Sequence, residues 1–424
     1  MGAIIFSTNE NNRLIAAQKI FEKKGFSSCT FKKTEKGTTL IYYCKKHYKG
    51  IYKSYYENNN GDYIVSTGTI FYRDLFGEDA LSLLLEDFSL KNFDYIEKNS
   101  TGHFFIFIKK GCRKYFFTDR SEHYMIYYSL EEGIILSTSF TALIASLKKK
   151  KISLNRMYEY ICLGPLNIDR TTILEGVYIF SGDKIGVVDS RGVQLIDKPE
   201  FEIINFPSDK DAISNVILDY FHRYFSPLKK YFNGKISAEI TGGVDTRLIL
   251  SLLEKENIDY SLLHYNINPE DLKIAKLISS KEKKKIFIYD SENDSFMNDE
   301  SQYKSFLDNL GYALFDNFFY IFGLNPKSFV SYVQVAKLGM LCLSGDGGEL
   351  FSQDQWTLNK KQRSINEIIK HYSTLDSINY NFYVNKEAYC RYLSNVQLKL
   401  TNFASYMHTT NIKNVYLLKG NATV

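Results

Sequence analysis

The stretch 235–256 reads KISAEITGGVDTRLILSLLEKE and divides into two periodicities. Up to Ile240 the apolar residues alternate as in a strand, and from Leu248 onward they recur at helical spacing. Gly242 and Gly243 therefore lie between a strand and the N-terminus of a helix. Unpaired N–H groups and a partial positive charge at a helix N-terminus attract anions, and glycines let an anion approach the backbone closely. The pattern indicates a phosphate-binding turn.

The residues around the two glycines favour this interpretation over a simple tight turn, which is the alternative for the dipeptide alone. Thr241 and Thr246 supply hydroxyl groups on both sides, and Asp245 supplies a carboxylate that can bridge a magnesium ion to phosphate oxygens. The hexapeptide TGGVDT resembles the S-G-G-x-D-S pyrophosphate loop of the ATP pyrophosphatase domain in the asparagine synthetase family. It lacks the lysine of the G-x-x-x-x-G-K-[ST] loop of kinases and GTPases.

A second glycine cluster, SGDGGELF at 344–351, follows an apolar strand expected at 340–344. A solvated turn is the alternative here too, but the carboxylates Asp346 and Glu349 are costly to bring together unless a cation lies between them. The asparagine synthetase family has a G-[DE]-G-x-D-E-x-F segment about a hundred residues after its first loop, in the same order and spacing. A third match, PEDLKIA at 269–275, resembles the family's acidic D-x-x-x-A helix start.

The two halves of the chain have different patterns. Up to about residue 200, β-branched and aromatic runs predominate, with short helices expected at 80–88 and 139–147. The strands expected there lie at 40–44, 61–72, 103–110, 113–120 and 133–138, and within 176–195. After a connector at 198–211, expected helices at 212–224 and 270–280 alternate with strands at 260–265, 285–289 and 340–344, which predicts a parallel sheet. We therefore divide the chain into domains at 1–200 and 201–424.

The N-terminal half is similar to the glutaminase-type domain of the same family. The similarity rests on GHFF at 102–105, TDR at 118–120, YY at 127–128 and STS at 137–139. It implies a combined α+β and α/β fold: a β-rich, Ntn-hydrolase-like sandwich, then a parallel-sheet α/β ATP pyrophosphatase domain of the adenine nucleotide alpha hydrolase-like type.

The N-terminal half departs from the family at its expected catalytic residues. Glutamine-hydrolysing members begin their mature chain with a cysteine that acts as nucleophile, whereas this chain has Gly2. The glutamine-binding N-G-E-[IL]-Y of the family is TGTIF at 67–71, without the asparagine of the oxyanion hole. We therefore expect no glutaminase activity and a domain that serves as a scaffold or a peptide-binding surface.

The resemblance implies a role for each matched residue. Those expected to bind ATP or pyrophosphate are Thr241, Gly242, Gly243, Asp245, Thr246, Ser344 and Gly345. Asp346 would lie at the reacting centre as a catalytic residue, and Asp245 and Glu349 would ligate Mg²⁺. In the family's chemistry a substrate carboxylate attacks the α-phosphate of ATP, and ammonia or an amine then displaces AMP from the acyl-adenylate to form an amide.

The end of the chain departs from the family as well. The second loop is one residue short, so one carboxylate of the family's Asp-Glu pair is missing. Only residues 352–424 follow it, which predicts a shortened domain. Lys413 and Lys419 are candidates, by position alone, for the late lysine of the family, although a solvated charge is the usual role of such a residue. His264, at an expected strand end, is either a nucleotide contact or a satisfied histidine.

The composition of the chain bears on its partners and on its cellular compartment. The chain has 424 residues, 44% apolar and 24% charged, and a net charge of +5 without a long basic run, which argues against nucleic-acid binding. The densest basic cluster, 148–151, is expected to be a solvated linker or face. Six scattered cysteines suggest reduced thiols in the cytoplasm, and no export, lipid or membrane-spanning segment is expected. The aromatic stretch 312–324 is expected to form a buried helix.

The leading hypothesis is therefore an ATP- and Mg²⁺-dependent, AMP-forming carboxylate–amine ligase without its own glutaminase. Its expected partners are a small-molecule or peptide carboxylate and an amine or ammonia, and a homodimer is compatible with the sequence. The alternatives are a non-catalytic or decayed nucleotide-binding homologue and an enzyme that closes lactams or macrolactams.

Overall fold

The computed structural model describes most of the first 289 residues and a short segment near 343. The described residues are 2–8, 12–24, 26, 29–35, 37–44, 52–122, 124–131, 133–163, 169–199, 209–266, 268–289, 341–345, 394 and 398–399. The expected helix at 312–324, Asp346, Glu349, Lys413 and Lys419 lie outside these residues.

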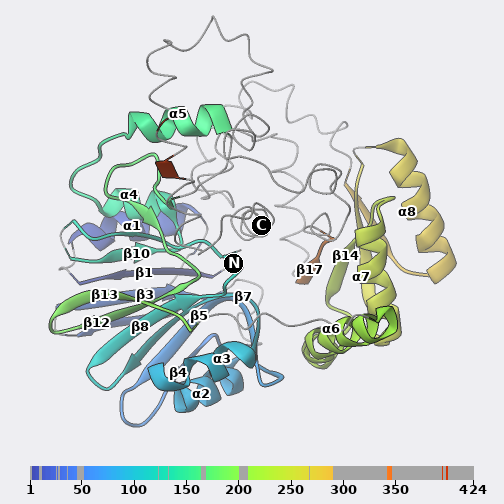
Figure 1. The fold of residues 1–424 in the computed structure, drawn as a ribbon, viewed down its shortest axis with the longest axis horizontal. Coiled ribbons are helices and arrows are strands. Elements are labelled where there is room, and N and C mark those ends of the chain that lie inside the picture. Colours follow the sequence, from blue (N-terminus) through green and yellow to red (C-terminus); the bar gives the residue numbers. More distant parts are fainter. Residues whose placement is uncertain are drawn as a thin grey trace, which may run out of the picture.

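Two antiparallel sheets form the N-terminal part (Figure 1). The first has the order β11-β9-β10-β1-β3-β2 and the second the order β13-β12-β8-β7-β5-β4, with β6 beside β5. The strands of the first sheet are β1 (Ala3–Ser7), β2 (Phe31–Glu35), β3 (Thr38–Tyr43), β9 (Tyr127–Ser129), β10 (Ile135–Ser137) and β11 (Tyr178–Ile179). Those of the second are β4 (Tyr55–Glu57), β5 (Tyr63–Tyr72), β6 (Leu75–Phe76), β7 (Ser100–Lys110), β8 (Arg113–Thr118), β12 (Lys184–Asp189) and β13 (Gly192–Asp197).

The sheets are stacked between two layers of helices, so that both faces of each sheet are covered. Alternation along β1 sends Ile5 into the core under α1 (Asn12–Lys23) and α4 (Phe140–Ser146), and Phe6 into the core between the sheets. Along β7, Phe105 faces the space between the sheets, whereas Ile106 packs under α2 (Glu78–Asp87) and α3 (Phe93–Lys98). The result is a four-layer sandwich (Figure 1). The remaining elements of this part are η2 (Leu90–Asn92) and α5 (Leu154–Leu163).

The third sheet is parallel, as the alternating pattern predicts. Its order is β16-β15-β14-β17, with β14 (Ile236–Glu239), β15 (Tyr260–Tyr265), β16 (Ile286–Tyr289) and β17 (Leu341–Leu343). The helices α6 (Lys210–Phe232), α7 (Val244–Lys255) and α8 (Pro269–Glu282) accompany it (Figure 1). The first described helix of the α/β part, α6, begins at Lys210.

An aromatic cluster joins the sandwich to the parallel-sheet part. Phe71 and Phe76 belong to the same buried core as Phe232 and the strand β14. The ring centroids of Phe76 and Phe232 are 5.0 Å apart, and the Tyr52 hydroxyl donates a hydrogen bond to the Tyr231 carbonyl at 3.0 Å. Burial of these large rings removes apolar surface from water. The two parts are therefore held together by a shared hydrophobic core as well as by the chain that connects them.

A partly buried ion cluster, centred on the buried Lys198, holds the end of the sandwich in place. The Lys198 ammonium donates to Glu97 Oε1 at 3.0 Å and to the Thr118 carbonyl at 2.7 Å, and Arg120 pairs with the same carboxylate at 2.6 Å. Burial lowers the pKa of Lys198, and the Glu97 carboxylate opposes that effect. Removing Glu97 would take the paired carboxylate from the buried Lys198 ammonium, which is more costly than losing a surface ion pair.

Several elements differ from the sequence-based expectation. The opening apolar segment forms the inner strand β1. This strand is buried on both faces, so its sequence does not alternate between apolar and polar residues. The elements α1, β2 and α5 were not expected. Helix α6 extends well past 224 because it continues through the buried Pro227 to Phe232, whose ring packs into the aromatic cluster.

No described helix has both the length and the apolar character needed to cross a bilayer. Among the described residues, cysteines 29, 44, 112 and 342 form no disulfide.

Alkaline pH should unfold the sandwich through its buried tyrosines. Burial raises the pKa values of Tyr63 and Tyr124 above that of an unfolded tyrosine, about 10. Their contribution to stability is therefore complete below pH ~10 and is lost as the pH rises further, by about 1.4 kcal/mol per pH unit for each tyrosine. We expect Tyr124→Phe to reduce that slope by one tyrosine's share, measured by urea unfolding at increasing pH.

The same substitution should cost some stability at neutral pH, because the Tyr124 hydroxyl donates to the Gly2 carbonyl at 2.6 Å. The exposed Tyr95, changed to Phe, is the matched control and should keep the slope of the unaltered protein. An unchanged slope in the Tyr124→Phe protein would show that this tyrosine does not drive alkaline unfolding.

Candidate functional site

The first glycine loop joins β14 to α7 and is held by its own threonines. Gly243 is the N-cap of α7 with extended backbone angles, and its N–H donates to Thr241 Oγ1 at 3.1 Å. The Thr241 N–H donates to Thr246 Oγ1 at 3.3 Å, and the two hydroxyl oxygens are 3.2 Å apart. Thr246 is buried, so its hydroxyl acts as an internal brace of the loop. The threonines thus shape the turn that the sequence analysis interpreted as a phosphate site.

The second glycine segment lies directly against this loop. Parallel pairing of β14 with β17 sets Ala238 opposite Leu343, so both strands end at the same edge of the sheet. A Cβ atom on Gly345 would lie 2.7 Å from the Thr246 nitrogen and 2.9 Å from the carbonyl carbon of Asp245. Only a glycine allows this approach without a shift of the backbone. The structure therefore brings Ser344 and Gly345 to the predicted loop, while Asp346 and Glu349 fall outside the described residues.

Helix α8 contributes a carboxylate that the sequence analysis did not assign to the site. Asp271 Oδ1 accepts a hydrogen bond from the Gly242 N–H at 2.9 Å, and a Cβ atom on Gly242 would overlap the same oxygen. Asn268 caps α8 by accepting from the Glu270 N–H at 3.1 Å, which fixes the first turn of α8 beside the loop. The acidic helix start at 269–275 was the available signal, but its partner across the sheet edge was not visible in the sequence.

Three further side chains define the surroundings of the loop. His264 ends β15, is 1% exposed, and has Nδ1 2.8 Å from the Ile240 carbonyl, which can only accept, so the proton lies on Nδ1. Its Nε2 is buried without a hydrogen-bond partner among the described residues. Arg247 Nε donates to the Gly243 carbonyl at 3.1 Å, so this side chain folds back onto the loop. Asp245 is exposed in the first turn of α7, where the helix dipole favours its charge.

The predicted metal site is only partly described. Asp245 offers one carboxylate at the loop, and Glu349 lies outside the described residues. Within those residues no group of three histidine, cysteine or acidic side chains is arranged to hold a metal ion. The chemistry of the one visible ligand, an exposed carboxylate beside backbone amides, suits Mg²⁺ bound jointly with phosphate oxygens.

At the N-terminus the structure places Gly2 beside β5, which carries the segment TGTIF at 67–71. A Cβ atom on Gly2 would lie 3.0 Å from the Tyr43 carbonyl oxygen and 3.3 Å from Thr67 Cγ2. The neighbouring Gly68 has a φ of 81°, and a Cβ atom there would overlap the His103 carbonyl. The space around Gly2 is therefore tight even for a single additional carbon.

Comparison with known proteins gives similarity to solved structures only. No protein-family model and no curated protein matches the chain. The glutamine phosphoribosylpyrophosphate (PRPP) amidotransferase from B. subtilis, complexed with ADP and GMP, is 10% identical with a TM-score of 0.32, covering 62% of this chain and 65% of its own. The allosteric regulatory enzyme of purine biosynthesis is 7% identical with a TM-score of 0.32, covering 68% of this chain and 80% of its own.

The chain thus spans about two thirds of the length of the first of these proteins.

Proposed function

We propose that the protein is an ATP-dependent amide-forming synthetase that adenylates a substrate carboxylate, releases pyrophosphate, and transfers the acyl group from AMP to ammonia or an amine. The observation that carries this proposal is the contact of the two glycine segments, with Gly345 against Asp245 and Thr246. Two loops that meet at the carboxyl edge of a parallel sheet, beside a helix N-terminus, provide backbone donors for a polyphosphate.

In this proposal the chain's own groups bind and orient the nucleotide. The loop 241–246 would hold the β- and γ-phosphates, and Ser344 and Gly345 would face pyrophosphate from the other side. Asp245 would hold Mg²⁺, which supplies neutralisation of the charge that builds up between the α- and β-phosphates. Asp346 and Glu349 keep the catalytic and metal-binding roles that the resemblance to asparagine synthetases implies.

The N-terminal sandwich would not supply ammonia. Gly2 has no nucleophile, and the Tyr43 carbonyl and Thr67 leave little room for a side chain in its place. The amine would therefore come from free ammonia or from a second substrate, which includes the closure of a lactam or macrolactam.

A non-catalytic nucleotide-binding protein is the second candidate, and Asp271 favours it. Its carboxylate accepts the hydrogen bond of the Gly242 N–H and is negatively charged, as a phosphate is. A nucleotide phosphate that accepts a hydrogen bond from the Gly242 N–H therefore has to displace the Asp271 carboxylate or bind beside its negative charge.

Exchange of labelled pyrophosphate into ATP, with a panel of carboxylates, tests the synthetase. We expect exchange with at least one carboxylate, and a loss of about a hundredfold or more in Asp245→Ala, because the variant removes the proposed magnesium ligand. Asp211→Ala is the matched control, because Asp211 is an acidic first-turn residue of another helix, α6, and it should retain the rate.

Formation of ADP in place of AMP would rule out the proposed reaction. Binding of ATP without turnover on any carboxylate would favour the non-catalytic candidate.

A second test concerns the charge of Asp271. Asp271→Asn keeps an oxygen that can accept from the Gly242 N–H but removes the negative charge, so we expect Mg²⁺–ATP to bind about tenfold more tightly in calorimetry. Glu270→Gln is the control, since Glu270 is exposed and pairs with Lys273 at 2.7 Å. Weaker binding in Asp271→Asn would mean that the carboxylate supports the bound nucleotide.

A further inference from the structure

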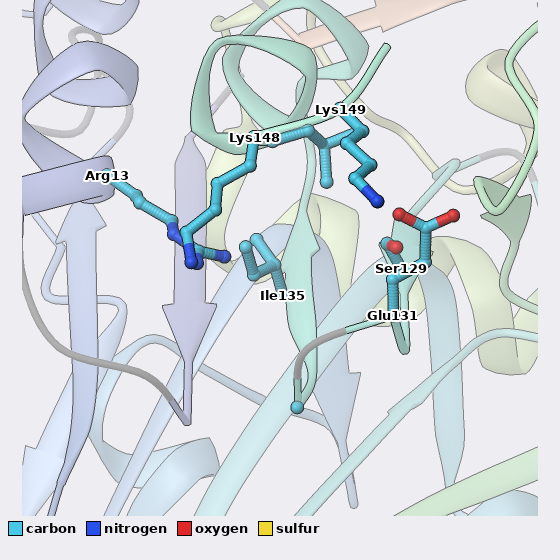
Figure 2. A pocket seen from close by; sticks show the side chains of 8 residues that line it. Arg13, Ser129, Glu131, Ile135, Lys148 and Lys149 are labelled. Atoms are coloured by element: carbon cyan, nitrogen blue, oxygen red, sulfur yellow. The ribbon is translucent and has the colours of Figure 1, made fainter. Parts of the chain in front are cut away.

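A polar cavity of about 220 Å³ lies in the N-terminal sandwich, beside α1 and α4 and away from the glycine loops (Figure 1). It is formed where β9 pairs with β10 and where the chain leaves α4. Ser129 on β9 lies opposite Ile135 on β10, and both line the cavity. The same lining includes Glu131, which follows β9, and Leu147 and Lys149, which follow α4 (Figure 2).

Ser129 brings a buried hydroxyl to this cavity. It lies two residues after Tyr127 on β9, so its side chain is on the same face of the sheet as the Tyr127 ring, which belongs to the core under α1 and α4. Ser129 is 2% exposed, and its Oγ has no hydrogen-bond partner among the described residues. A buried hydroxyl of this kind destabilises the fold unless a molecule in the cavity bonds to it.

Two side chains of opposite charge face each other beside this hydroxyl. Figure 2 shows the Lys149 ammonium and the Glu131 carboxylate pointing toward one another next to Ser129. Within the described part of the chain, neither of the two charged groups forms an ion pair. The Glu131 carboxylate lies so close to Gly176 that a Cβ atom there would overlap its Oε1, and Gly176 also has a φ of 74°. A glycine at this position therefore leaves room for the carboxylate.

The open charges of the cavity are one carboxylate and one ammonium. Arg13 and Lys148 lie apart from Ser129 in Figure 2, and each already has an interaction partner, so neither counts as an open charge. A simple anion is attracted by Lys149 and repelled by Glu131, and the reverse holds for a simple cation. A ligand that carries both charges at its two ends matches both side chains.

We propose that this cavity binds a small α-amino acid as its zwitterion. The Glu131 carboxylate pairs with the ammonium group of the ligand, the Lys149 ammonium pairs with its carboxylate, and the Ser129 hydroxyl donates a hydrogen bond to that carboxylate. An apolar cavity of about 150 Å³ holds one benzene molecule, so a cavity of 220 Å³ has room for a small amino acid and not for a peptide. Ile135 and Leu147 provide apolar contacts for a short side chain.

This site is separate from the proposed ATP site, and neither proposal depends on the other. The run 148–151, expected to be a solvated face, is divided by the fold: Lys149 lines the cavity, whereas Lys151 pairs with Glu175 at 2.9 Å. Lys150 is exposed and outside the lining, which makes it a matched control for Lys149. Glu86, exposed on α2 in the other helix layer, is the control for Glu131.

Calorimetric titration of the full chain with glycine, L-alanine and L-valine, in the absence of ATP, tests the proposal. We expect at least one of them to bind, about tenfold or more weakly in Glu131→Gln and in Lys149→Gln. Lys150→Gln and Glu86→Gln should bind like the unaltered protein. Because the candidate ATP site can also take an amino acid as its carboxylate substrate, only the binding lost in both Glu131→Gln and Lys149→Gln is assigned to the cavity.

Propionate and ethylammonium test whether both charges of the ligand are needed. Propionate is alanine without its ammonium group and ethylammonium is alanine without its carboxylate, so we expect each to bind at least about tenfold more weakly than the amino acid. The proposal fails if either of them binds as tightly as the amino acids or if none of the three amino acids binds. It also fails if Lys149→Gln and Lys150→Gln bind alike.

Ser129→Ala provides an independent test through thermal unfolding. Without ligand, loss of an unpartnered hydroxyl should leave the midpoint temperature unchanged or raise it. At saturation with the tightest-binding of the three amino acids, the variant should gain less in midpoint temperature than the unaltered protein, because it lacks one donor to the ligand. A lower midpoint without ligand, or an equal gain with it, would contradict the role of this hydroxyl.

Discussion

The parallel pairing of β14 with β15 on one side and β17 on the other is the constraint on which the candidate ATP site depends. It brings the ends of strands separated by about a hundred residues to one edge of the sheet, where α7 begins. The approach is so close that a side chain on Gly345 would collide with the backbone of Asp245 and Thr246. The two glycine segments are thus parts of one structure, although each alone is compatible with a simple turn.

The sandwich and the parallel sheet share a hydrophobic core, and the candidate ATP site lies at the parallel sheet. Aromatic rings around Phe76 and Phe232 join them, and the ion cluster around Glu97 closes the end of the sandwich. The sandwich has four packed layers, and its Gly2 lies tightly against the Tyr43 carbonyl and Thr67.

The periodicity of apolar residues predicted those elements in which that spacing is regular over a short stretch of sequence. β14, α7, β15 and α8 lie close to their expected bounds, because their apolar residues recur at the spacing of a strand or a helix. It failed where burial is two-sided or where tertiary packing overrides a local rule. β1 has no alternation because both its faces are covered, and α6 continues through Pro227 because the rings beyond it are buried against the sandwich.

The sequence by itself determined the loop TGGVDT, its place between a strand and a helix, and the parallel sheet, because these follow from residue types at short separation. Only the tertiary structure decided that the Asp271 carboxylate accepts a hydrogen bond from the Gly242 amide and that Gly345 lies against Asp245 and Thr246. Such contacts join residues distant along the chain, and their existence depends on strand register and helix placement, which spacing along the sequence does not encode.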